Sequence, residues 1–86
     1  MDARRKRVKF RAQYMGSREN DQLFGPFADR YVDEMSETEL DTFETLMAQS
    51  DVDLFYWVTG QRPVPPEFQT DVLRLIQDFN FNRHKP

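Results

Sequence analysis

Residues 36–47 read Ser36-Glu37-Thr38-Glu39-Leu40-Asp41-Thr42-Phe43-Glu44-Thr45-Leu46-Met47, and they carry the clearest structural signal in the 86-residue chain. Ser36 and Glu39 form the S-x-x-E pattern of a helix capping box, in which each side chain accepts a hydrogen bond from the backbone N–H of the other residue. Leu40, Phe43 and Met47 follow at the spacing of one helix face. The stretch therefore predicts an amphipathic helix from about residue 37 to 48.

Two more helices are expected on the C-terminal side of this stretch. Ser50 or Asp51 can cap the first, which should end at Gly60, a natural helix stop. Its large apolar residues are expected in the core: Leu54, Phe55, Trp57 and Val58. Pro65-Pro66 is expected to open the second, because the missing N–H of proline has no helical partner in the first turn. Its predicted apolar face consists of Phe68, Val72, Leu75, Ile76 and Phe79.

Two helices are also expected on the N-terminal side. One should cover about residues 20 to 35, where Pro26 should kink or loosen it; its apolar residues are Leu23, Phe24, Phe27, Tyr31 and Met35. The N-terminal segment should be the other, with Val8, Ala12 and Met15 on one side. No segment alternates with the period of a strand, so we predict an all-α fold, a compact five-helix bundle. Residues 1–86 should form one helical domain, with residues 1–3 and 81–86 as frayed tails.

Charge is unevenly distributed along the chain. Residues 3–18 contain seven basic side chains and no acid, whereas residues 19–53 contain eleven acids and a single base, Arg30. Such a separation can steer association with a charged partner. The alternative, that these charges simply lie on solvated helix faces, stays open.

The residues expected of an enzyme are missing from the sequence. The only histidine, His84, lies two residues from the end, and the chain has no cysteine and no phosphate-binding or serine-nucleophile glycine motif. Paired carboxylates such as Asp51 and Asp53 occur where helix N-termini favour negative charge. We therefore expect no enzymatic activity and no metal site, and the lack of cysteine and of a signal peptide fits a cytoplasmic location without membrane insertion.

The segment from Tyr14 to Asp21 is the strongest candidate for a functional surface. It lies between two predicted helices, and Gly16 permits a positive φ or the close approach of another backbone. Charged residues follow the glycine at once: Arg18, Glu19 and Asp21. The simpler interpretation is a helix connection in which Gly16 ends one helix and Asn20 or Asp21 begins the next.

Three motifs in register resemble the SdhE (YgfY) flavinylation factors, which are relatives of mitochondrial succinate dehydrogenase assembly factor 2. The resemblance covers residues 4 to about 80. Its motifs are Gly16-Ser17-Arg18-Glu19-Asn20-Asp21, Leu23-Phe24-Gly25-Pro26-Phe27-Ala28-Asp29 and Asp51-Val52-Asp53-Leu54-Phe55-Tyr56-Trp57. One position departs from the family, because Met15 replaces the arginine of the R-G-x-x-E motif, and methionine cannot form the bidentate contacts of a guanidinium.

The resemblance implies an assembly factor that binds the flavoprotein subunit of succinate dehydrogenase or fumarate reductase and promotes covalent attachment of FAD to a histidine of that partner. FAD would be handled on the partner, with no cofactor bound stably by this chain, and the free chain is expected to be a monomer. The implied partner-binding residues are Met15, Gly16, Ser17, Arg18, Glu19 and Asp21, with Arg11 and Tyr14 as secondary candidates. Two alternatives remain: an antitoxin-like (CptB-type) regulator, and nucleic-acid binding through the basic segment, which the acidic remainder of the chain disfavours.

Overall fold

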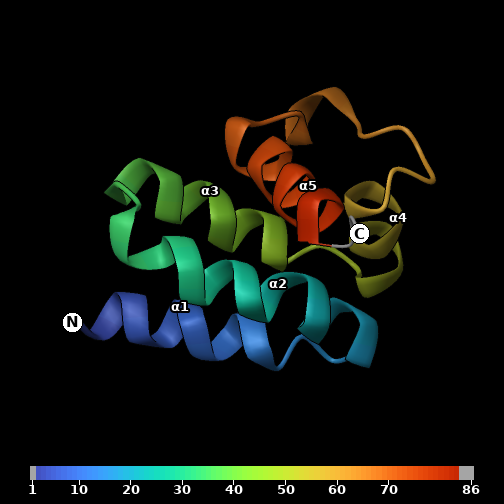
Figure 1. Ribbon diagram of the computed structural model, residues 1–86. Coiled ribbons are helices and arrows are strands. Elements are labelled where there is room, and N and C mark those ends of the chain that lie inside the picture. The colour runs from blue at the N-terminus through green and yellow to red at the C-terminus, as the bar shows by residue number, and fades with distance from the viewer. Residues whose placement is uncertain (1, 84–86) are drawn as a thin grey trace.

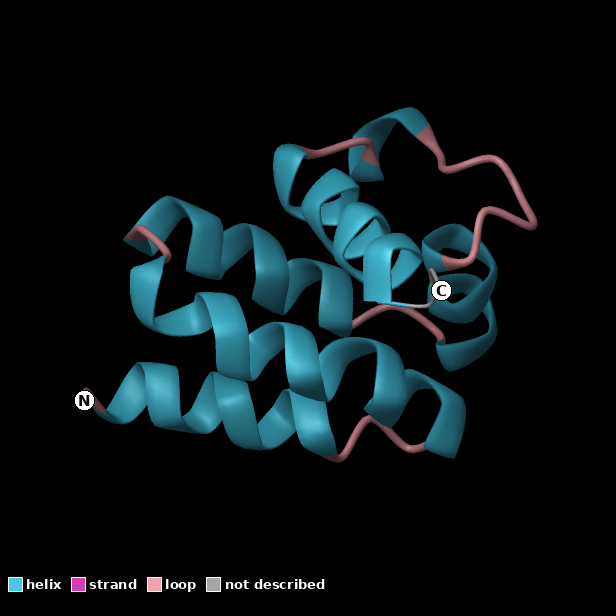
Figure 2. Ribbon diagram, in the orientation of Figure 1, coloured by secondary structure: helices cyan, strands magenta, loops and turns pink. Residues whose placement is uncertain are grey.

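The computed structural model describes residues 2–83, and this part of the chain is helical with no strand (Figures 1 and 2). It contains five α-helices and two short 3₁₀ helices, which confirms the all-α, five-helix prediction. In chain order they are α1 (Ala3–Gln13), α2 (Arg18–Tyr31), η1 (Val32–Glu34), α3 (Glu37–Met47), α4 (Asp51–Val58), η2 (Pro66–Phe68) and α5 (Asp71–Arg83). Residues 3 and 81–83, expected in frayed tails, are helical, whereas His84 lies outside the described residues.

Helix α2 is the central element of the fold. It lies side by side with α1 and also packs against α4 and α5 (Figure 1). Helix α3 follows α2 in the opposite direction, and α5 closes the core over α2, α3 and α4. As a result, α1 lies at one edge of the molecule, with its opposite side turned away from the other helices.

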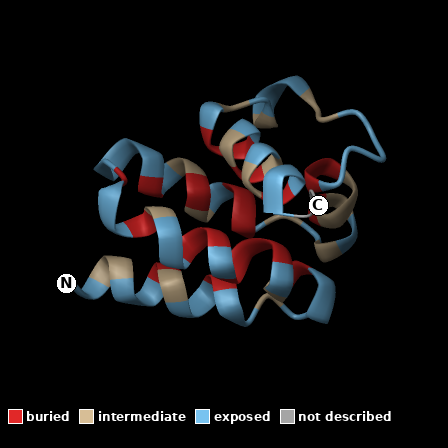
Figure 3. Ribbon diagram, in the orientation of Figure 1, coloured by how far each residue is buried: buried red, intermediate tan, exposed pale blue. Residues whose placement is uncertain are grey.

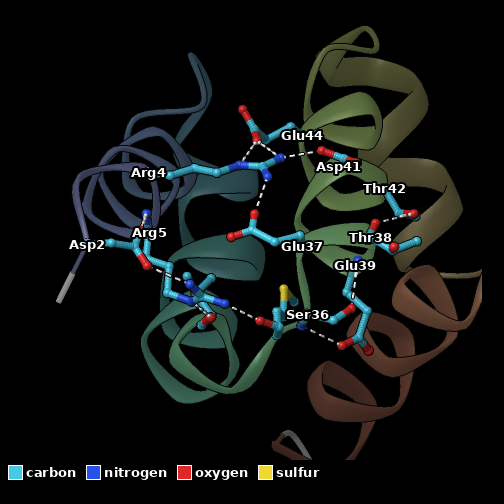
Figure 4. Close-up of polar contacts among 12 residues, drawn as sticks. Asp2, Arg4, Arg5, Ser36, Glu37, Thr38, Glu39, Asp41, Thr42 and Glu44 are labelled. Carbon is cyan, nitrogen blue, oxygen red and sulfur yellow. Dashed lines mark hydrogen bonds and ion pairs between the residues drawn. The ribbon is translucent and has the colours of Figure 1, made fainter.

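The capping box that predicted α3 is present (Figure 4). The Ser36 N–H donates to Glu39 Oε1 at 2.9 Å, and the Glu39 N–H donates to Ser36 Oγ at 3.1 Å. Ser50 caps α4 in the predicted way, because its hydroxyl accepts from the Asp53 N–H at 3.2 Å. Gly60 follows α4 with a φ of +77°, the left-handed conformation expected of a glycine helix stop.

The predicted bounds of two helices are wrong. Pro65-Pro66 does not open the last helix: only the short η2 begins there, and α5 begins at Asp71 because Thr70 caps it, accepting a hydrogen bond from the Leu73 N–H at 3.2 Å. Phe68 therefore belongs to η2, where its ring stacks on Trp57 with centroids 5.1 Å apart. The helix expected over residues 20–35 is α2, which begins earlier, at Arg18, and ends at Tyr31.

Pro26 lies inside α2 without ending it. Its nitrogen cannot donate to the carbonyl of Gln22, four residues earlier. That carbonyl accepts instead from Arg83 Nη1 at 3.1 Å. A side chain from the end of α5 thus replaces the backbone hydrogen bond that the proline removes.

The core draws residues from all five α-helices (Figure 3). Its centre is aromatic: the Phe27 ring meets that of Phe43 edge-on at 5.5 Å, and Phe24 stacks on Phe43 at 6.2 Å. The predicted core positions Leu54 and Trp57 are buried, whereas Phe55 is only half-buried. Gly25 is also buried, and a Cβ there would lie 3.3 Å from Gln13 Cγ, so the glycine allows α1 and α2 to approach closely.

Arg4 connects the basic N-terminal segment to the acidic helix α3 (Figure 4). Its guanidinium binds Asp41 and Glu37 at 2.5 Å each and Glu44 at 2.6 Å. The hydrogen bond to Asp41, followed by that to Glu44, raises the pKa of Arg4 above its usual value. Part of the charge separation seen in the sequence is therefore used inside the fold, to hold α1 against α3.

Candidate functional site

The connection between α1 and α2 is built around Gly16, which has a φ of +102°. Residues other than glycine rarely adopt a backbone conformation with this φ. A Cβ at this position would also lie 2.8 Å from Oδ2 of Asp51, which is closer than van der Waals contact allows. The backbone conformation is thus the main reason for glycine at position 16, because the contacting atom is the free end of the Asp51 side chain, which can rotate away.

Hydrogen bonds from the motif residues themselves fix the shape of this connection. Ser17 caps α2, because its hydroxyl accepts from the Asn20 N–H at 3.2 Å. The carboxylate of Asp21 accepts from the Met15 N–H at 2.5 Å. The simple expectation that Asn20 or Asp21 caps α2 is therefore wrong, and Asp21 serves to hold the loop in place.

Asn20 belongs to the first motif but was not among the predicted partner-binding residues. Its side chain is fully buried, and its Nδ2 donates to the backbone carbonyl of Asp51 at 2.8 Å. Its Oδ1 has no hydrogen-bond partner among the described residues. A signal was present in the sequence, because Asn20 shares the helix face of Leu23, Phe24 and Phe27 and hence faces the core. Asn20 ties the motif around Gly16 to the motif that begins at Asp51.

These two motifs, separated by 29 residues of sequence, meet at a pocket of about 280 Å³ between the start of α2 and α4. The polar part of its wall comes from Ser17, Glu19 and Asp51, and the apolar part from Val52, Phe55 and Tyr56. Val52 is 60% exposed, although it is a large apolar residue. The pocket therefore combines carboxylates with an open apolar surface, as protein-binding surfaces commonly do.

The predicted site residues differ in their exposure. Gly16, Arg18 and Glu19 are exposed, as are the secondary candidates Arg11 and Tyr14. Three others are half-buried: Met15, Ser17 and Asp21. Met15 packs against the hydrophobic core, so the residue that replaces the family arginine has a structural contact of its own. Fewer residues are therefore accessible to a partner than the predicted set of partner-binding residues contains.

Two further findings concern metal binding and membrane-spanning helices. Within residues 2–83, no group of three or more histidine, cysteine or acidic side chains is placed so that it could hold a metal ion. None of the helices in the same range has both the length and the apolar character needed to cross a membrane.

Fold and site together define a small all-α protein whose candidate site is an exposed surface formed where two sequence motifs meet. The family model described as flavinator of succinate dehydrogenase matches residues 6–80, and the chain belongs to this family. It is similar to the FAD assembly factor SdhE of Acetobacter pasteurianus, with 38% identity over 82 residues, which cover 94% of this chain and 75% of that protein.

Mitochondrial proteins are similar as well. Succinate dehydrogenase assembly factor 2 of Drosophila grimshawi is 32% identical over 84 residues, covering 95% of this chain and 57% of that protein. The protein of the same name from Dictyostelium discoideum is 37% identical over 73 residues, covering 85% and 52%. The chain thus spans little more than half the length of these mitochondrial relatives.

Proposed function

We propose that this chain binds the flavoprotein subunit of succinate dehydrogenase, or of fumarate reductase, and promotes the covalent attachment of FAD to it. Family membership supports this proposal, as do the names of the relatives, which are assembly factors for succinate dehydrogenase or for FAD. The observation that carries it is the position of Gly16: an exposed glycine, with a φ of +102°, packed against Asp51 of the second family motif. A partner backbone can approach such a surface closely.

In this proposal the chain acts by positioning its partner and supplies no catalytic group. The surface around Gly16 docks near the flavin site and holds the partner in the geometry where its own histidine meets the flavin. Holding reacting groups in the correct geometry can supply a large part of a rate acceleration. Glu19 pairs with a basic or N–H group of the partner and Arg18 with an acidic one, whereas Ser17 and Asp21 keep the loop in shape.

FAD itself is proposed to be held by the partner. The pocket beside Gly16 is small for a dinucleotide, and Glu19 and Asp51 in its wall would repel a pyrophosphate. The residues of this pocket therefore do not fit a stable FAD site. The monomeric state of the free chain and its cytoplasmic location belong to the same proposal.

The proposal is tested by complementing a deletion strain with the wild-type chain, with Gly16→Arg and with Gly60→Arg. Gly60 is a matched control, because it also has a positive φ but no atom within 4 Å of its Cβ position. Flavin fluorescence of the flavoprotein subunit in a denaturing gel reports covalent attachment. We expect fluorescence with the wild-type chain and Gly60→Arg and none with Gly16→Arg.

Normal flavinylation in the deletion strain itself would sink the proposal. Growth arrest of that strain with flavinylation intact would instead support the antitoxin-like regulator. Circular dichroism of both variants separates loss of the docking surface from loss of the fold.

A further inference from the structure

The basic residues of helix α1 lie on two faces of the helix, and the two groups differ in their contacts. On the inner face, every cation is paired: Arg4 with α3, Arg5 with Asp2, and Lys9 with Asp33 at 2.8 Å. Arg5 also donates to the backbone carbonyl oxygens of Val32 and Met35. These contacts explain the inner cations as parts of the fold.

The outer face of α1, defined here as Ala3, Lys6, Arg7, Phe10, Arg11 and Tyr14, has no such explanation. Its three cations are exposed, and their side chains have no ion pair or hydrogen bond with any residue in the described range 2–83. Arg18, at the start of α2, is exposed and unpaired within the same range. Four cations are therefore available to pair with acidic groups of another molecule.

Two large aromatic residues lie among these cations. Phe10 is 66% exposed and Tyr14 is 67% exposed, and their ring centroids are 4.6 Å apart. Beside Phe10, a surface hollow of about 540 Å³ is lined by Ala3, Lys6 and Arg7. Single exposed apolar residues are common, but a contacting aromatic pair ringed by cations has the composition of a protein-binding surface, where aromatic residues and arginine are enriched.

The outer face is continuous with the candidate site. Tyr14, at its C-terminal end, directly precedes the Met15–Asp21 segment, and Arg18 lies within that segment. Figure 1 shows α1 along an edge of the molecule, with its side opposite α2 uncovered by any other helix. A partner that docks on Gly16 can therefore extend along α1 without meeting another element of the fold.

We propose that the outer face of α1 is a second contact strip that binds an acidic patch on the same flavoprotein; this rests on the proposed function. The strip supplies long-range attraction through its cations and buried contact area through Phe10 and Tyr14. A protein patch fits better than a nucleic acid, because the chain has a net charge of -3 and Glu19 and Asp21 lie at the end of the strip. Repulsion from these acids would oppose an extended polyanion but not a bounded acidic patch.

The test measures the affinity of the purified flavoprotein subunit for the full chain by calorimetry at low and high NaCl. The variant Lys6→Glu/Arg7→Glu reverses two charges on the strip, and the control Arg30→Glu/Arg74→Glu makes the same change in net charge elsewhere on the surface. We expect the strip variant to bind at least about tenfold more weakly at low salt. Its affinity should also vary less with salt than that of the wild-type chain or the control.

A second variant, Phe10→Gln/Tyr14→Gln, keeps the strip's charges and good helix-forming residues. It should bind about tenfold more weakly at both salt concentrations. Equal affinities for the strip variants and the control, with wild-type binding intact, would overturn the inference about the strip and leave the proposed function unaffected. Salt-dependent binding of duplex DNA that only Lys6→Glu/Arg7→Glu abolishes, with flavoprotein affinity unchanged, would assign the strip to nucleic acid and also overturn it. Failure of the wild-type chain to bind the flavoprotein would refute the proposed function as well.

Discussion

Replacement of Gly16 by alanine separates the two reasons for which a glycine is needed at this position. The first is the backbone, since a non-glycine residue in a left-handed conformation costs about 1–2 kcal/mol. The second is the contact with Asp51, where a Cβ would lie 2.8 Å from Oδ2. Oδ2 is the free end of the Asp51 side chain, so the contact can be relieved by turning this carboxylate, at a cost of about 0.5–1.5 kcal/mol. We therefore expect Gly16→Ala to lower the free energy of unfolding by about 2–3 kcal/mol.

Gly60→Ala is the matched control, because Gly60 has a φ of +77° and open space around its Cβ position. It should show only the backbone cost, about 1–2 kcal/mol. The measurement is urea unfolding followed by the fluorescence of Trp57, the single tryptophan, which is buried against Phe68. In an Asp51→Ala background the excess cost of Gly16→Ala should disappear. Equal losses for the two glycine variants, or an excess that persists without Asp51, would refute the reasoning.

Two further predictions concern helix caps. Ser36→Ala should lower the free energy of unfolding by about 1 kcal/mol, because the Glu39 N–H loses its acceptor, whereas Ser36→Asp should retain most of the stability. Urea unfolding of both variants checks this, and an equal loss in the two would contradict it. The backbone N–H of Arg5, and then its side chain, lower the pKa of Asp2 below 3.8, so the stability that this cap adds is present above pH 3.8 and lost as the pH falls below that value. The difference in unfolding free energy between the wild-type chain and Asp2→Ala should therefore shrink on acidification, and a difference that grows would show that the sign is wrong.

The parts of the fold that the sequence predicted depend on local chemistry. The capping box of Ser36 and Glu39 and the stop at Gly60 each involve residues within a few positions of one another. The helix boundaries that were wrong involve competition between local signals: Pro65-Pro66 is a valid helix start, but Thr70 provides a cap five residues later. The sequence pattern alone does not show which of two competing signals sets the start of the helix.

Contacts between distant residues could not be predicted in this way. The three carboxylates around Arg4 are 33 to 40 residues away in sequence, and nothing in the sequence pattern assigns them to this arginine. The candidate site likewise combines a feature visible in the sequence with contacts that depend on packing. Gly16 stands out in the sequence as a glycine between two helices, but its contact with Asp51 and the role of Asn20 depend on how α2 and α4 pack.

The central claim is that this chain promotes covalent flavin attachment through the surface around Gly16. The most direct test mixes the purified flavoprotein subunit, lacking covalent flavin, with FAD and measures the flavin that remains attached after denaturation. We predict that the wild-type chain and Gly60→Arg accelerate attachment and that Gly16→Arg does not, with circular dichroism used to verify that all three are folded. Attachment at the same rate with and without the wild-type chain would contradict it.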